Sequence, residues 1–252
     1  MLGRVTVLRR SKGHGSSRRY LHVRVAPLAP EEVAEVEGLP VTTVERTAID
    51  LSSCLSFERA VAVLDAALHL GGDAHVLEDS RVAAAGRDGV GTARAALASA
   101  DGRSESVGES VSRVRLAEAG LPLPELQLNV FNDFGAWVAR CDFGWEELGV
   151  LGEFDGKLKY TGTPDEVAQA VMREKRREAS LRELGWIVVR WDWGDLADPS
   201  GLRRRVEAAI DQARPSQIRG HTELSPAGPP ISPLPERALA PDLSGARARL
   251  GS

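Results

Sequence analysis

The stretch LQLNVFNDFGAWVARCDFGWEELGVLGEFD, residues 126–155, decides the fold of this chain. Its first two runs alternate apolar and polar residues and are joined by Asn132-Asp133-Phe134-Gly135, a composition typical of a β-hairpin turn. A third run, GVLGEFD at 149–155, follows closely. The stretch therefore predicts three consecutive strands.

The flanking sequence places a helix on each side of these strands. Ser106 or Gly108 is expected to open a helix that ends at Gly120, before two prolines. A second helix is predicted from about 164 to 184, followed by WIVVRW at 186–191, an apolar strand of the kind buried on both faces. The order α-β-β-β-α-β predicts an α/β domain.

The N-terminal region predicts a different organisation. RVTVL at 4–8 and YLHVRV at 20–25 are β-prone runs separated by a polar segment, which predicts a hairpin with a long loop. Helical spacing and alanine content then predict helices at 44–55, 57–70, 75–85 and 90–100. Residues 1–104 are thus expected to form a small sheet fragment and a helical region without a cluster of chemically reactive side chains.

The C-terminal part is expected to contain less structure. A further helix is plausible at about 200–213, whereas 214–252 is rich in proline, alanine, serine, glycine and arginine and has no periodicity. We therefore expect a region at 1–104, an α/β domain at 105–213 and a disordered tail at 214–252.

The composition limits the possible functions. The 252 residues carry a net charge of -4, so the whole molecule does not resemble a general polyanion binder. Local basic patches occur in the N-terminal arm around Arg9, Arg10 and Arg18, and in the run REKRRE at 173–178. The alternative interpretation is that both patches are ordinary solvated surface.

The sequence does not predict a membrane protein. Its longest apolar candidate, AVAVLDAALHL at 60–70, is interrupted by Asp65 and His69 and is too short to span a bilayer. The N-terminus has no apolar signal region, so a cytoplasmic location is expected by default. Cys54 and Cys141 stand far apart, which predicts neither a disulfide framework nor a zinc site.

Four carboxylates lie at informative positions in the α/β domain. Glu109 is in the first helix, Asp142 ends the second strand, and Glu153 and Asp155 share one face of the third strand. Carboxylates gathered at one point repel each other unless a cation neutralises them, and oxygen ligands suit Mg²⁺ or Mn²⁺. The alternative for Glu153 and Asp155 is an edge strand with one polar face.

The second helix of the domain also directs charge inward. Glu174 and Glu178 share a side with the apolar residues Val167, Val171 and Leu181, although like charges four residues apart are unfavourable without a compensating cation. The alternative is an exposed, charge-rich helix.

Five segments of this sequence have counterparts in a known family of domains. They are GES (108–110), CDFGW (141–145), GEFDGKLKY (152–160), EKRRE (174–178) and LGWIVVRW (184–191). In this order they resemble the Vsr-like endonuclease domain of the PD-(D/E)XK superfamily. They are similar to actinobacterial proteins that join this domain to a region like type IV antitoxin-like transcriptional regulators. Residues 20–104 resemble the linker of those proteins, and no counterpart of their winged helix is expected within 1–104.

The resemblance implies a Mg²⁺- or Mn²⁺-dependent endonuclease that hydrolyses DNA phosphodiester bonds. It implies Asp142, Glu153 and Asp155 as metal ligands and Glu109 as a further catalytic carboxylate at the edge of the metal shell. It implies Lys159 or Lys175 as the cation beside the phosphate, with Lys157 as another source. Asp155 stands where the superfamily has a lysine, and Lys159 where related proteins have a histidine. Arg173, Arg176 and Arg177 are the expected nucleic-acid contacts. The alternative is a non-catalytic DNA-binding or regulatory protein that keeps the fold.

Overall fold

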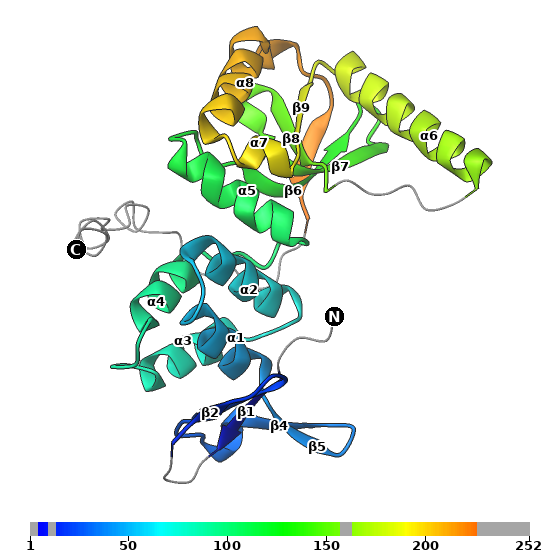
Figure 1. Ribbon diagram of the computed structural model, residues 1–252. Helices are drawn as coiled ribbons and strands as arrows, with labels where there is room; N and C mark the ends of the chain where they lie inside the picture. Colours follow the sequence, from blue (N-terminus) through cyan, green and yellow to red (C-terminus); the bar gives the residue numbers. More distant parts are fainter. Residues whose placement is uncertain (1–4, 10–13, 157–162, 226–252) are drawn as a thin grey trace. The chain divides into compact units, whose positions relative to one another are not determined.

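The computed structural model describes residues 5–9, 14–156 and 163–225 and shows a mixed α/β protein. The chain forms two compact units, Met1–Thr47 and Ala48–Ser252 (Figure 1). In the described parts of the chain, no helix combines the length and the apolarity needed to cross a membrane.

The first unit contains two small sheets and differs from the predicted hairpin. Its strands are β1 (Val5–Arg9), β2 (Ser16–Ser17), β3 (Leu21–Val25), β4 (Val33–Val36) and β5 (Leu39–Thr42), with a short 3-10 turn at Pro30–Glu32. Strand β1 pairs with β3 in parallel, so the prediction of a hairpin between them is wrong. The polar segment after β1 itself supplies β2, which forms the antiparallel partner of β3 and leaves the other edge of β3 for β1.

A turn at Glu37-Gly38 joins β4 and β5, two short strands that the sequence did not predict. Glu37 and Gly38 both have positive φ, 53° and 77°, which is the backbone of a tight two-residue hairpin turn. Beside this hairpin the buried Arg46 donates to Glu32 at 2.8 Å and to the Pro27 carbonyl at 3.0 Å. The ion pair fixes the start of the first helix against the chain that precedes it.

The predicted helical region is confirmed, with small shifts at the ends. The helices are α1 (Val44–Ser52), α2 (Phe57–His69), α3 (Ala74–Ala83), α4 (Val90–Ala98) and α5 (Val107–Glu118). Their shared core is built largely from alanine and leucine, including Ala60, Leu64, Leu77 and Ala96. Small side chains let these short helices approach closely.

The α-β-β-β-α-β order is confirmed and continues into further elements. After α5 come β6 (Glu125–Phe131), β7 (Trp137–Trp145), β8 (Val150–Phe154), α6 (Pro164–Glu183), β9 (Ile187–Trp191), α7 (Trp193–Leu196), α8 (Pro199–Gln212) and β10 (His221–Leu224). The strands form one sheet in the order β10-β6-β7-β8-β9. Only the β8–β9 pair is parallel among these described strands.

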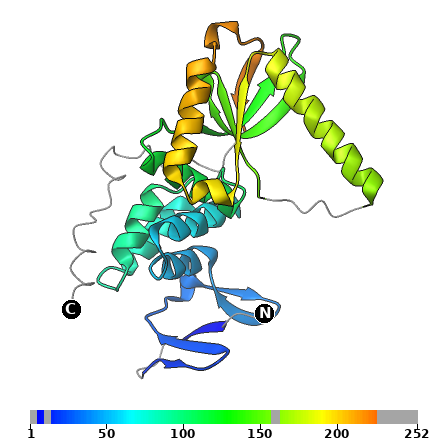
Figure 2. The same cartoon turned by 45° about the horizontal axis from the view of Figure 1, so that its top comes forward.

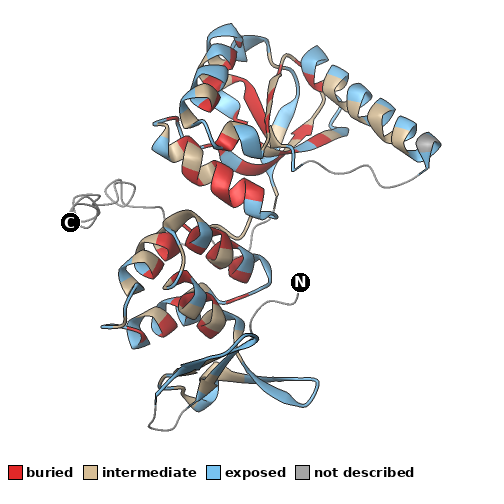
Figure 3. Ribbon diagram, in the orientation of Figure 1, coloured by how far each residue is buried: buried red, intermediate tan, exposed pale blue. Residues whose placement is uncertain are grey.

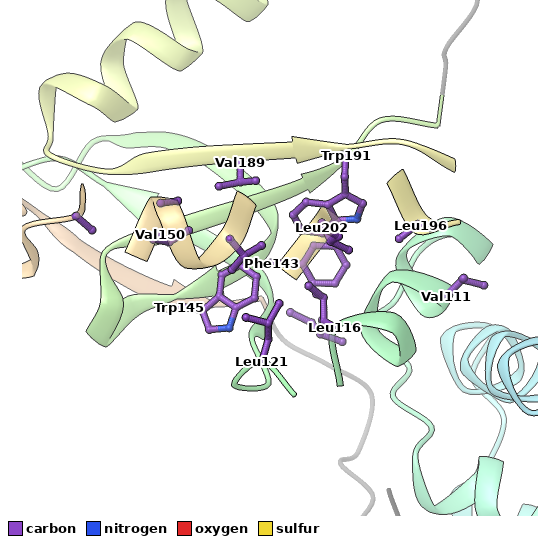
Figure 4. Close-up of a cluster of buried hydrophobic side chains, with 14 residues drawn as sticks. Val111, Leu116, Leu121, Phe143, Trp145, Val150, Val189, Trp191, Leu196 and Leu202 are labelled. Carbon is purple, nitrogen blue, oxygen red and sulfur yellow. The ribbon is translucent and has the colours of Figure 1, made fainter. Parts of the chain in front are cut away.

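Helices cover both faces of this sheet (Figures 1 and 2). On one face α5, α7 and α8 pack over a core that contains Phe143, Trp145 and Trp191 (Figure 4). On the other face α6 contributes Leu181 to a smaller core with Cys141. Buried residues accordingly concentrate on the central strands and on the facing sides of the helices (Figure 3).

Strand β10 corrects the predicted C-terminal boundary. Residues 221–224 fall in the segment expected to be disordered, yet they pair antiparallel with β6, His221 opposite Phe131. The stretch is too short to show a periodicity, and the bare edge of β6 determines its conformation. Residues Pro215–Gln217 of the predicted tail form a 3-10 turn, and 226–252 lies outside the described residues.

The predicted boundary at 104/105 falls inside the second unit, because α5 belongs to two cores. Val114 packs with the helical region, while Val111 and Leu116 pack under the sheet. Arg113 reaches back to the buried Asp65, with Nη2 to Oδ2 at 2.8 Å. Residues 48–104 are therefore packed onto the α/β domain rather than linked to it.

We predict that Asp65→Asn lowers the free energy of unfolding by about 3 kcal/mol, because it leaves the Arg113 guanidinium without its buried counter-ion. Urea denaturation measures the loss. Glu207→Gln, which breaks an exposed pair with Arg203, is the control and should cost less than ~0.5 kcal/mol. Equal losses in the two variants would show that the Asp65 pair contributes no more than a surface pair.

Candidate active site on the mixed sheet

Asp142 lies where β7 passes beside β8. The two strands are antiparallel, with Phe143 opposite Gly152, so the next positions along the ladder are Asp142 and Glu153. The backbone N–H of Phe154 donates to Asp142 Oδ2 at 2.8 Å. Strand pairing thus brings two of the predicted site residues to one point.

Asp142 is electrostatically unusual. Burial raises its pKa, the hydrogen bond from Phe154 opposes that effect, and the neighbouring carboxylates of Glu109 and Glu153 raise the pKa further, to about 7. The more distant Arg140 only partly compensates, since it pairs with Glu105 at 2.7 Å. Asp142 therefore lacks a cation that would match its charge, among the residues described.

Glu153 has the opposite environment. Its Oε1 accepts a hydrogen bond from Arg177 Nη1 at 2.5 Å, and its Oε2 accepts from Arg177 Nη2 and Arg190 Nε, both at 2.8 Å. Burial raises the pKa of Glu153, but the two guanidinium groups outweigh burial and hold that pKa below its usual range. Glu153 is an ionised carboxylate between two arginines.

The inward direction of Glu174 and Glu178 is confirmed. Arg190 lies directly opposite Glu153 in the parallel β8–β9 pair and donates to Glu174 and Glu178 as well. Arg177 bonds Glu174 through Nε at 2.9 Å and Nη2 at 2.6 Å. The compensating cation for the two glutamates is therefore Arg190, which sequence reasoning missed.

A signal for Arg190 was present in the sequence. It is the one charged residue in the apolar run WIVVRW, and a charge in a strand covered on both faces needs a partner. The alternation of the strand could not identify the three glutamates that meet it, because two of them come from α6.

Glu109 is buried in the first turn of α5 and accepts hydrogen bonds from groups at the N-terminal end of that helix. Its Oε1 accepts from Ser106 Oγ at 2.7 Å, and its Oε2 accepts from Glu105 N at 2.9 Å and Gln127 Nε2 at 2.8 Å. Ser106 in turn caps the helix by accepting from Glu109 N. The S-x-x-E spacing at 106–109 is a known capping signature, so Glu109 has a structural role as well as its place beside Asp142.

An open cavity of about 1170 Å³ lies over these residues. Trp137 and Phe154 contribute to its lining, together with three arginines and four carboxylates. The arginines are Arg140, Arg177 and Arg190, and the carboxylates are Asp142, Glu153, Asp155 and Glu174. Its volume exceeds that of a bare phosphate or ion, and its excess of carboxylate disfavours an anion that arrives without a cation.

The remaining predicted residues divide into three groups. Asp155 and Arg177 line the cavity. Arg173, Lys175 and Arg176 are exposed on α6 and are not part of that lining, and Lys159 lies outside the described residues, as does Lys157.

The expected shell of Asp142, Glu153 and Asp155 is not assembled as a metal site. Within the described ranges, no three or more histidine, cysteine, aspartate or glutamate side chains are grouped so that they could hold a metal ion. The physical reason lies in Glu153, whose two oxygens point to Arg177 and Arg190. The repulsion expected among crowded carboxylates is thus relieved at Glu153 by arginine and persists at Asp142.

Two proteins of Mycobacterium tuberculosis are similar to this chain. They are the uncharacterized protein MT2308 of strain CDC 1551 / Oshkosh and the uncharacterized protein Rv2248 of strain ATCC 25618 / H37Rv. Each is 35% identical over 181 residues, which cover 71% of this chain and 65% of the relative. The chain thus spans just under two thirds of the length of these relatives. No family model matches the sequence, and no solved structure matches it.

We predict a specific pH dependence from Asp142. Its folded-state pKa of about 7 lies above the ordinary value of 3.8, so unfolding releases a proton between these two values and the wild type loses stability as the pH rises toward 7. Asp142→Asn removes this loss. Between pH 5 and 8 in a chelating buffer, the unfolding free energy of the variant minus that of the wild type should rise by on the order of 2 kcal/mol. A constant difference would mean that Asp142 titrates like an exposed carboxyl.

Proposed function

We propose that residues 105–225 form a PD-(D/E)XK-type domain that hydrolyses DNA phosphodiester bonds with Mg²⁺ or Mn²⁺. The observation that carries the proposal is Asp142, a half-buried carboxylate that lines the cavity and whose pKa is raised to about 7 by burial and by the charges of Glu109 and Glu153. The order α5-β6-β7-β8-α6-β9 supports it, because it is the order that the sequence resemblance implies.

Carboxylate oxygens are the ligand type that a hard divalent cation prefers, but the described side chains of this cavity are not grouped as a metal site. Asp142 and Asp155 offer oxygen ligands toward the same space, and Glu153 could join them by leaving its arginines. A bound Mg²⁺ would polarise the phosphoryl group of the substrate and activate a water molecule for attack. Asp142 is the first ligand in this proposal, because a nearby cation would favour its ionised form.

Arg177 is a further candidate for the cation beside the substrate, in addition to Lys159, which lies outside the described residues. It lines the cavity, and its planar guanidinium can bond two phosphate oxygens at once. Lys175 is exposed outside that lining. In this proposal Arg177 stabilises negative charge that develops on the phosphoryl group.

The exposed side of α6 supplies the wider DNA contact. Arg173, Lys175 and Arg176 are exposed, and none of them forms an ion pair with another described residue. Arginines on the inner side are already bonded to glutamates. Exposed cations next to the cavity are suited to the phosphate backbone, and they give affinity without reading sequence.

A second candidate function is a non-catalytic, DNA-binding or regulatory protein, antitoxin-like in its N-terminal region. Both carboxylate oxygens of Glu153 are bonded to Arg177 or Arg190. This favours the second candidate, because ion pairing that holds the fold together is enough to explain why a glutamate stands at this position. A cytoplasmic location would suit either function and is part of the proposal.

Plasmid nicking tests the catalytic proposal. Wild-type protein should convert supercoiled plasmid to open circles with Mg²⁺ or Mn²⁺ and remain inactive with a chelator. Asp142→Asn should lower the rate by at least ~100-fold, because the loss of a proposed direct ligand should cost more than the roughly 10- to 100-fold loss caused by removing a partner of a ligand. Asp211→Asn removes an exposed carboxylate of the same domain and should cleave like wild type. Metal-independent binding of the plasmid without nicking would favour the regulatory candidate.

The DNA contact is tested by the salt dependence of binding, measured by fluorescence anisotropy in a chelating buffer. Arg173→Gln and Arg176→Gln together should reduce the slope of log K against log salt by about 0.9 for each lost phosphate contact. Arg204→Gln removes an exposed arginine on α8 and should leave the slope unchanged. An unaltered slope in the double variant would exclude the exposed side of α6 as the DNA-binding surface.

A further inference from the structure

Trp137 is an exposed tryptophan without an aromatic partner. Its side chain is 59% exposed, and no other ring or guanidinium group of the described residues stacks on it. The other tryptophans are buried, apart from Trp193, which packs edge-on against Phe154 with the ring centroids 5.0 Å apart. An indole left exposed in this way offers a large, flat surface to a ligand.

An irregularity in the β6–β7 ladder places Trp137 at the cavity. Val130 lies opposite Ala139, whereas Phe131 lies opposite Trp137, so Val138 has no residue opposite it and the register shifts there. An extra residue in one strand turns the side chains that follow it to the other face, and such bulges are common beside active sites. Trp137 accordingly lines the cavity.

Hydrogen bonds hold the indole ring by its edge. Trp137 Nε1 donates to Asn129 Oδ1 at 3.1 Å, and Asn129 Nδ2 donates to Ser225 Oγ at 2.8 Å. The neighbouring ring of Phe131 is already stacked on His221, with the centroids 4.9 Å and the planes 4° apart. The ring of Trp137 is therefore fixed in orientation and still open to a planar partner.

The charges around the cavity favour a neutral planar group over an anion. The lining holds four carboxylates and three arginines, an excess that opposes a bare phosphate but not a nucleobase, which is uncharged at neutral pH. The cavity extends to Ala170 of α6, the helix on which Arg173, Lys175 and Arg176 are exposed. A base can thus enter the cavity while its phosphates stay outside, on the cations of α6.

We propose that Trp137 stacks on an unpaired base, so that the domain binds single-stranded DNA in preference to duplex DNA. In a duplex both faces of each base are stacked on neighbouring bases, whereas a single strand exposes them. Stacking on an indole is tolerant of sequence, because every base has a π-face. The inference rests on the proposed function for its ligand class, DNA, and it requires neither a cation nor cleavage.

Fluorescence anisotropy tests the inference, with labelled oligodeoxythymidine of about 12 nucleotides in a chelating buffer. Trp137→Ala should weaken binding about 10-fold, because one base loses its stacking partner. Trp137→Phe keeps an aromatic ring without the N–H group and should stay within about 3-fold of wild type. Phe134→Ala is the matched control: Phe134 is an exposed aromatic residue of the same hairpin that does not line the cavity, so this variant should bind like wild type.

Intrinsic fluorescence and an abasic probe report stacking directly. A base stacked on an indole quenches its emission, and Trp137 and Trp193 are the exposed tryptophans. Oligodeoxythymidine should quench the emission of wild type and of Trp193→Phe, but not that of Trp137→Phe. An abasic oligonucleotide of the same length should bind wild type as weakly as oligodeoxythymidine binds Trp137→Ala. Because Trp137 is exposed, its variants should keep the wild-type melting temperature.

The outcomes separate this inference from the proposed function. If Trp137→Ala binds oligodeoxythymidine as tightly as wild type does, stacking is overturned, whatever the nicking assay shows. Equal losses in Trp137→Ala and Trp137→Phe would also overturn it, since the loss would then come from the bond to Asn129. Tighter binding of a duplex than of the single strand would refute the preference. The expected loss in Trp137→Ala, found in a protein that does not nick plasmid, would reject the nuclease and support the stacking site.

Discussion

Burying carboxylates on the inner strands of a sheet requires positive charge beside them, and this requirement organises the α/β domain. Glu153 meets it through Arg177 of α6 and Arg190 of β9. These ion pairs hold α6 against the parallel β8–β9 pair of the sheet. The apolar contact of α6 with the sheet is otherwise concentrated near Leu181. Asp142, one strand away, is left without such a partner among the described residues. Of the two carboxylates that line the cavity here, Glu153 is therefore neutralised by arginine and Asp142 is not.

Helix α5 transmits order between the helical region and this site. Its residue Arg113 holds Asp65, its Ser112 hydroxyl accepts the indole N–H of Trp191 at 2.8 Å, and its first turn carries Glu109. Glu109 in turn holds Gln127, a non-glycine residue with a positive φ of 53° in β6. A single helix therefore fixes β6, β9 and the surroundings of Asp142. This explains why the helical region and the sheet belong to one compact unit.

The secondary structure of this domain could be predicted from sequence because its signals are local. The hairpin turn at 132–135, the glycine after α5 and the long amphipathic α6 each require only a few neighbouring residues. Pairings between distant segments could not be predicted, such as β1 with β3 or β10 with β6, because the partner edge decides them. The same limit applies to the site. The positions of Asp142, Glu153 and Asp155 followed from strand alternation, whereas the arginines that occupy Glu153 come from elements 24 and 37 residues away.

Strand β10 has a consequence for the synthesis of the chain. It is the last described strand, yet it covers the edge of β6, whose partner residues were translated about ninety positions earlier. Until residue 224 leaves the ribosome, this edge of β6 has no strand to pair with. An unpaired edge is a template for other chains. The sheet is thus completed late in translation. A ribosome that stalls before β10 would release a domain whose unpaired strand edge is open to pairing with other chains.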